Sequence, residues 1–196
     1  GSSLWRISLI LLEAFAVSHR DHASITGVQK FLPSCAGLQL QKEAELLDIN
    51  SAKRPIIAIL GAAKIADKIK LISTLLEKVD TFLLGGAIIF TFYKAMGLEV
   101  GKSLIDDSSV PTARELLSNK KIILPTDIVV ANEISENAKT MTVRYDEIPK
   151  DCIGLDIGEE SVNNFKNLLK SSKTIVWNGP MGKFEIEKFS KGTREI

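Results

Sequence analysis

The 196-residue sequence has few residues of the kinds that build disulfide frameworks or metal sites. Its two cysteines, Cys35 and Cys152, lie far apart and match no metal-ligand spacing. We therefore expect two free thiols in a reducing compartment. The two histidines, His19 and His22, are three residues apart, but zinc would need further ligands that no pattern here identifies.

An excess of charge of one sign is also missing. Lysine and arginine number 25 and aspartate and glutamate 24, for a net charge of +1. This balance gives no support for a nucleic-acid-binding surface or a polybasic membrane patch. No apolar run approaches the length of a membrane span. Residues 4–12 are mostly apolar and favour a strand buried on both faces, with a signal peptide as the alternative.

The hydrophobic pattern alternates between short apolar runs and stretches with helical spacing. Apolar runs that end at glycine, proline or asparagine predict strands at residues 55–60, 81–84, 122–124, 127–130, 153–157 and 174–177. Helical spacing predicts helices at residues 40–47, 65–79, 87–96, 112–117 and 159–169. The alternation predicts an α/β fold over residues 55–196, with an open, mostly parallel, Rossmann-like sheet of about five or six strands and helices on both faces.

Glycine-containing turns follow several of these strands, at residues 61–64, 85–87, 154–158 and 177–182. Ligands of open α/β sheets bind at the carboxyl ends of the strands, where glycine permits close approach to the backbone. Neither G-x-G-x-x-G nor G-x-x-x-x-G-K-[ST] occurs, so the chain carries neither a dinucleotide fingerprint nor a Walker loop.

Two lysines follow the first turn. Lys64 and Lys68 are four residues apart, so their amines project from one face near the start of a helix. Free N–H groups at a helix start, together with two amines, can hold a phosphate. The alternative is a solvated helix face. The pair His19 and Arg20 leaves a similar choice between an anion site and a solvated turn.

Several segments together resemble phosphoglycerate kinases. They are residues 18–24 (SHRDHAS, beside the family's A-H-R-A-H-A-S), 59–69 (ILGAAKIADKI, beside I-L-G-G-A-K-V-x-D-K-I), 155–158 (LDIG) and 175–182 (IVWNGPMG, followed by Phe184 and Glu185). Their order and spacings are those of the family, and the resemblance covers residues 13–196.

The resemblance implies a phosphotransferase that moves a phosphoryl group between 1,3-bisphosphoglycerate and ADP, with magnesium, in glycolysis or carbon fixation. It implies a remnant of a phosphoglycerate-binding α/β domain at residues 1–39, a connecting helix and linker at 40–54, and an incomplete nucleotide-binding domain at 55–196. The implied ligands are ADP or ATP with magnesium and phosphoglycerate. A monomer in the cytoplasm is expected, with a plastid as the alternative.

The resemblance also assigns roles to residues. Lys64 and Lys68 are the implied catalytic residues, and Arg20 and His19 the implied phosphoglycerate-binding residues. Adenine would lie against Gly86, Gly154, Leu155 and Pro180, the phosphates near Asn178, and the ribose hydroxyls at Glu185. The full implied nucleotide set is Gly61, Ala62, Ala63, Lys64, Lys68, Gly86, Ala87, Gly154, Leu155, Asn178, Pro180, Gly182 and Glu185.

The sequence departs from the family pattern at several positions. Ala62 and Ala87 replace glycines, which adds methyl groups where backbone would approach a nucleotide. Asp21 adds a negative charge beside the expected phosphoglycerate site. The D-x-N, H-x-G-R and G-G-G-D-[ST] segments of the family have no counterpart, so no metal ligand is expected in these 196 residues. A relative without catalysis that binds a nucleotide or a protein partner is the alternative function.

We predict that residues 1–196 alone show no phosphoglycerate kinase activity. Phosphoryl transfer requires both reactants to be aligned and the charge on the moving group to be neutralised. Each lost electrostatic contact of this kind costs a factor of about 10²–10³ in rate. A coupled assay with magnesium, on protein freed of host enzyme, tests this. Turnover within about tenfold of an intact family member would contradict the argument.

Overall fold

A computed structural model describes residues 9–13, 18, 21–46 and 48–196. The chain divides into two compact units, residues 1–51 and 52–196.

The first unit is small and built from short elements. Strand β1 (Ile10–Leu12) pairs in parallel with β2 (Ser34–Ala36), a strand that the periodicity did not predict. Single turns at Ala23–Gly27, Val28–Lys30 and Ile49–Ser51 accompany helix α1 (Leu38–Leu46). The prediction of a strand buried on both faces is wrong for β1, because Leu11 is 59% exposed. Residues 4–8 of that prediction lie outside the described part.

The second unit contains a parallel sheet of four strands in the order β5-β4-β3-β9. These are β3 (Ile56–Gly61), β4 (Thr81–Gly85), β5 (Ile122–Ile123) and β9 (Thr174–Asn178). All three pairings are parallel. Every residue of β3 is buried, which is why its sequence is a continuous apolar run without polar alternation. The α/β class and the mostly parallel central sheet are confirmed.

A second sheet of three strands was not expected. Its order is β7-β6-β8, with β6 (Asp127–Ala131) antiparallel to both β7 (Thr140–Arg144) and β8 (Ile153–Ile157). The prediction of one sheet with five or six strands is therefore wrong. An apolar run identifies a buried strand but does not specify its partner or direction. Strand β7 was missed because it is an edge strand with mostly exposed residues.

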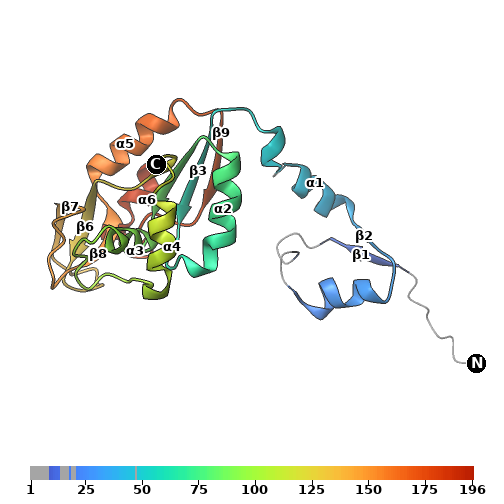
Figure 1. The fold of residues 1–196 in the computed structure, drawn as a ribbon, viewed down its shortest axis with the longest axis horizontal. Helices are drawn as coiled ribbons and strands as arrows, with labels where there is room; N and C mark the ends of the chain where they lie inside the picture. Colours follow the sequence, from blue (N-terminus) through green and yellow to red (C-terminus); the bar gives the residue numbers. More distant parts are fainter. Residues whose placement is uncertain (1–8, 14–17, 19–20, 47) are drawn as a thin grey trace, which may run out of the picture. The chain divides into compact units, whose positions relative to one another are not determined.

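Helices flank the sheets on both faces (Figure 1). They are α2 (Ile69–Lys78), α3 (Ile88–Ala95), α4 (Val110–Leu116), α5 (Glu159–Leu169) and α6 (Lys191–Glu195). Helix α2 follows a 3-10 turn, η5 (Ala66–Lys68), and its apolar stripe Ile72, Leu76 and Val79 is buried as its spacing predicted. Short 3-10 turns also precede α4 (η6, Asp107–Ser109) and α6 (η7, Glu187–Phe189).

The hydrophobic core occupies both faces of the parallel sheet. Alternate residues of a strand point to opposite faces. Ile57 and Ile59 of β3 and Leu83 of β4 pack against Val162 and Phe165 of α5. The alternate residues of the same strands are equally buried on the opposite face; they are Ala58, Leu60, Phe82 and Leu84.

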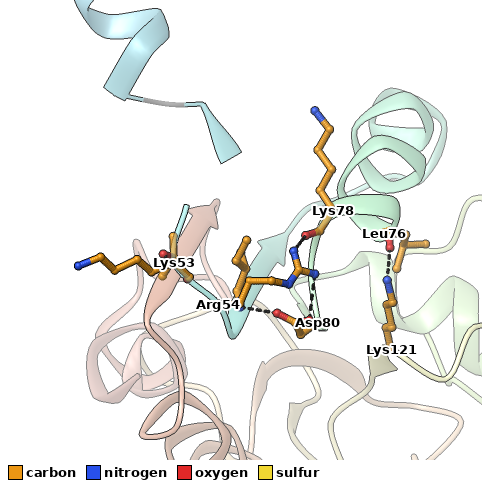
Figure 2. A network of polar contacts seen from close by, with 8 residues as sticks. Lys53, Arg54, Leu76, Lys78, Asp80 and Lys121 are labelled. Atoms are coloured by element: carbon orange, nitrogen blue, oxygen red, sulfur yellow. Dashed lines mark hydrogen bonds and ion pairs between the residues drawn. The ribbon is translucent and has the colours of Figure 1, made fainter. Parts of the chain in front are cut away.

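Polar contacts join the elements at the amino edge of this sheet (Figure 2). Asp80, just before β4, accepts the N–H of Ile56 at 2.7 Å and the Arg54 guanidinium at 3.0 Å. Arg54 also donates to the carbonyl of Lys78 at 3.0 Å, and Lys121 donates to that of Leu76 at 2.7 Å. Both cations therefore satisfy carbonyl groups in the last turn of α2, where the helix dipole favours positive charge.

We predict that Asp80→Asn lowers the free energy of unfolding at pH 7. The hydrogen bond from the Ile56 N–H, and then Arg54, hold the pKa of Asp80 below its ordinary value of 3.8. Because the folded pKa lies below the unfolded one, this stabilisation is present above about pH 4 and is lost as the pH falls through the folded pKa. Urea unfolding of both proteins at several pH values measures it.

The control is Glu77→Gln on the exposed side of α2, because Glu77 has no partner among the described residues. It should change stability little at any pH. A difference between the wild type and Asp80→Asn that stays constant down to pH 2 would contradict the assignment.

Candidate functional site

Three parallel strands of the second unit end side by side. Gly61 at the end of β3 is in register with Gly85 of β4, and Leu60 is in register with Asn178 of β9. Strand register therefore brings together three of the predicted glycine turns, which are separated by up to about a hundred residues of sequence. This is the edge at which open α/β sheets bind ligands.

Backbone hydrogen bonds join these turns directly. The N–H of Gly86 donates to the Met181 carbonyl at 2.7 Å, and the N–H of Ile88 donates to the Ala62 carbonyl at 2.7 Å. Gly86 has a φ of +69°, and a Cβ there would lie 2.8 Å from the Ala62 nitrogen. A side chain at Gly86 would therefore be strained by its backbone and would also force the first two turns apart. The three turns form one rigid surface.

A cavity of about 530 Å³ opens on this surface. Many of the residues predicted to bind nucleotide line it: Gly61, Ala62, Ala63, Gly86, Ala87, Gly154, Leu155, Pro180, Gly182 and Glu185. The volume lies in the range of small-molecule sites, and most of the lining is apolar. Strand β8, which belongs to the antiparallel sheet, contributes residues 153–156 to the same cavity, so most of the turn predicted at residues 154–158 is strand.

Other lining residues were missed by sequence reasoning. They are Ile89, Phe90, Leu104, Ile134, Ile153, Asp156, Met181, Lys183 and Phe184. Leu104, Ile134 and Phe184 are large apolar residues that remain 48%, 52% and 49% exposed. Each stands among polar residues in a loop, so no periodicity marks it. Their exposure beside a cavity makes them candidate ligand contacts.

The lysines lie beside the cavity and do not line it. The ammonium of Lys68, in η5, donates to the side-chain oxygen of Asn178 at 3.4 Å. The structure thus brings together two of the residues predicted to contact phosphates, from positions 110 residues apart. Lys64 is exposed and lies near the Asp106 carboxylate. A phosphate at this point would meet the ammonium of Lys68 and the amide of Asn178.

Asp106 is an acidic neighbour that the sequence reading did not identify. Its carboxylate accepts the hydroxyls of Ser108 at 2.7 Å and Ser109 at 2.8 Å, and the N–H of Ala66 at 3.4 Å. The hydroxyl of Ser108, then that of Ser109, hold the pKa of Asp106 below its ordinary value, with a smaller effect from Lys64. Asp106 therefore stays ionised and occupies a free N–H of the η5 turn.

Two charged residues at the rim of the cavity, Lys183 and Glu185, form a pair. Lys183 lies 3.4 Å from the Glu185 carboxylate, and both side chains are about half exposed. The hydrogen bond from its own N–H, helped by Lys183, keeps the pKa of Glu185 below its ordinary value. Glu185 is thus an ionised acceptor at the rim of the cavity.

The predicted phosphoglycerate residues His19 and Arg20 lie outside the described residues. Asp21, the extra acidic residue beside them, accepts a hydrogen bond from the hydroxyl of Thr26. Within the described part of the chain, no three histidine, cysteine, aspartate or glutamate side chains come together as a metal site. None of the helices described has the length and apolar character needed to span a membrane.

Comparison with known proteins gives one consistent family. The family model for phosphoglycerate kinase matches residues 7–196. The chain is 49% identical to the phosphoglycerate kinase of Finegoldia magna over 195 residues, covering 96% of this chain and 49% of that one. It is 47% identical to the chloroplastic phosphoglycerate kinase of Volvox carteri over 196 residues, covering 96% of this chain and 42% of that one.

Solved structures agree with the sequence matches. Phosphoglycerate kinase from Coxiella burnetii superposes with a TM-score of 0.86 at 37% identity, over 96% of this chain and 50% of that one. The enzyme from Pyrococcus horikoshii gives a TM-score of 0.79 at 29% identity, again over 96% and 50%. The chain thus spans about half the length of the relatives it matches. With identity near 49% along almost its whole length and the matching fold, the chain belongs to the phosphoglycerate kinase family.

Proposed function

We propose that this chain forms the nucleotide side of a phosphoglycerate kinase, which transfers a phosphoryl group between 1,3-bisphosphoglycerate and ADP. The observation that carries the proposal is the union of three strand-end turns around a largely apolar cavity, with Lys68 and Asn178 in contact beside it. An apolar cavity that leads to a cationic turn matches the two ends of a nucleotide, a flat base and a charged phosphate chain.

The adenine ring would occupy the apolar part of the cavity. Gly86, Gly154, Leu155 and Pro180 would contact its faces, and the exposed side chains of Ile134 and Phe184 would cover its outer edge. The ionised carboxylate of Glu185 at the rim would accept hydrogen bonds from the ribose hydroxyls. Ala62 and Ala87 line the same cavity, so their methyl groups would narrow the space beside the nucleotide.

The phosphates would lie outside the cavity, at the turn of residues 61–64. Lys64 and Lys68 would supply positive charge, and Asn178 would donate its amide group. Charge neutralisation of this kind is the main contribution of a protein to phosphoryl transfer, because little covalent chemistry is required of it. Asp106 would be a competing anion at the same turn, held by Ser108 and Ser109.

The other reactant would bind at residues outside the cavity. We propose that Arg20, with His19 beside it, contributes to binding phosphoglycerate. Magnesium accompanies ADP or ATP in this reaction, but among the described residues no three histidine, cysteine, aspartate or glutamate side chains come together to hold it. The alternative, a relative that binds nucleotide or a protein partner without catalysis, uses the same cavity.

The cellular setting is also a proposal. The relatives include bacterial proteins and chloroplastic ones from Volvox carteri and Arabidopsis thaliana. We propose a cytoplasmic monomer, with a plastid as the alternative compartment.

We predict that Lys64→Ala weakens ADP binding by about 1.5–3 kcal/mol, the range for a hydrogen bond to a charged group. Lys68→Ala should weaken ADP binding by a similar but smaller amount. The ammonium of Lys68 already donates to Asn178, so part of its interaction with a phosphate replaces an existing contact. Isothermal titration of ADP into the wild type and both variants measures the change.

The matched control is Lys173→Ala. Lys173 is an exposed lysine that precedes β9 at the opposite edge of the sheet, so its loss removes the same charge far from the cavity. ADP affinity should then be unchanged. If the wild type binds ADP and Lys64→Ala binds it equally well, the phosphate assignment is wrong. If ADP binds but the full-length protein transfers no phosphoryl group, the non-catalytic alternative is correct.

A further inference from the structure

One wall of the cavity has no regular secondary structure. Residues 180–185 all line the cavity, yet none of them belongs to a helix or a strand. Three hydrogen bonds attach this wall to its surroundings. The N–H of Lys183 donates to the Leu155 carbonyl at 2.7 Å, the Met181 carbonyl accepts the Gly86 N–H at 2.7 Å, and the Met181 N–H donates to the hydroxyl oxygen of Thr193 at 2.9 Å.

Beneath this wall lies the buried carboxylate of Asp156, to which the proposed function gives no role. Asp156, in β8, is only 3% exposed. One of its oxygens accepts the N–H of Ile157 at 2.9 Å, and the other accepts the N–H of Gly192 in α6 at 2.8 Å. A Cβ at either Gly182 or Gly192 would overlap the Asp156 carboxylate. The carboxylate is therefore enclosed between the wall and α6.

No cation compensates this carboxylate among the described residues. The charged groups of the neighbouring elements are paired elsewhere: Lys183 with Glu185, Lys191 with Glu159 and Glu195, and Arg194 with Glu187. Burial therefore raises the pKa of Asp156 to about 7, although its two backbone hydrogen bonds act in the opposite direction.

We propose that Asp156 is a positioning residue that holds the wall of residues 180–185 against β8, by packing under Gly182 and by binding the backbone of Gly192. Helix α6 then connects Asp156 to the wall of residues 180–185. Asp156 fixes its start through Gly192, and Thr193, the next residue, fixes the wall through Met181. Only the expected effect on nucleotide binding rests on the proposed function.

The enclosure of Asp156 links the wall to pH. When the wall is closed, the pKa of Asp156 lies above the value for a solvated carboxyl, so the closed state takes up a proton more readily than an open one. Closure is therefore favoured most at low pH, and this advantage is lost as the pH rises through about 7. The carboxyl would change its charge within the physiological range.

Amide hydrogen exchange between pH 6 and 8, corrected for intrinsic rates, tests the proposal on the 196-residue chain. The N–H groups of Met181, Lys183 and Gly192 should be less protected than those of β3, because they exchange through a local opening. Their protection should fall with rising pH by up to about tenfold per unit below about pH 7 and level off above it, where the carboxylate is ionised in both the closed and the open state. In Asp156→Asn this pH dependence should disappear.

Two further variants keep the test decisive. Asp127→Asn is the matched control, because Asp127 is a buried carboxylate that binds the N–H groups of Glu160 and Ser161 at the start of α5, away from the cavity. It should leave the pH dependence at Met181, Lys183 and Gly192 intact. Thr193→Val should lower their protection at every pH while keeping the pH dependence, and it serves if Asp156→Asn does not fold.

Two results would overturn the proposal. One is equal protection and equal pH dependence in the wall and in β3, which would mean that Asp156 acts on the whole fold. The other is a pH dependence that survives in Asp156→Asn. Titration with ADP is a separate arm, in which Asp156→Asn should raise the dissociation constant about fivefold, as for one lost hydrogen bond. Absence of ADP binding by the wild type would refute the proposed function and leave the exchange result standing.

Discussion

The parallel register of β3, β4 and β9 is the constraint on which the rest of the second unit depends. Because Gly61 pairs with Gly85 and Leu60 with Asn178, three chain segments leave the sheet at one edge and must turn within hydrogen-bonding distance of one another. Little room remains for side chains there, as Gly86 shows. The cavity opens at this edge, and the glycines and alanines of the turns form part of its lining.

The two edges of this sheet differ in how their charged side chains are paired. At the amino edge, Arg54, Asp80 and Lys121 satisfy the backbone groups of α2 and β3, and every strong contact stays within the protein (Figure 2). At the carboxyl edge, Lys64 is exposed and the contact between Lys68 and Asn178 is a long one of 3.4 Å. Groups with weak internal partners are the ones that a ligand can engage at low cost, because few existing hydrogen bonds must break.

The antiparallel sheet gives the cavity its second side. Strand β8 pairs with β6 in that sheet, and its residues Gly154 and Leu155 face the cavity. The N–H of Gly154 donates to the hydroxyl oxygen of Ser103, which ties the loop that carries Leu104 to the same strand. Phe189 packs with Leu155 in a separate small core below. The antiparallel sheet thus contributes part of the apolar lining through strand β8.

The hydrophobic pattern of the sequence predicted most of the helices and strands. A strand buried on both faces gives a continuous apolar run, and a helix gives apolar residues at steps of three and four. The run of residues 55–60, the stripe through Ile72 and Val79, and helix α5 all lie where their patterns predicted. The glycine turns at residues 61–64, 85–87 and 177–182 were identified for the same local reason, whereas most of the turn predicted at 154–158 belongs to β8. Pattern failed for β7, whose exposed residues carry no apolar signal, and for the division into two sheets, since strand partners are chosen by contacts distant in sequence.

The tertiary structure alone decided which of these turns meet and what surrounds them. Nothing in the local sequence marks Leu104, Ile134 and Phe184 as cavity residues. They line one cavity only because three separate loops converge there. Asp156 reads in sequence as part of a strand-end turn, and its unusual pKa exists only because Gly182 and Gly192 exclude water from both sides of its carboxylate. Composition and spacing can specify a helix or a strand through neighbours along the chain. Desolvation and convergence depend on neighbours in space, which only the folded chain supplies.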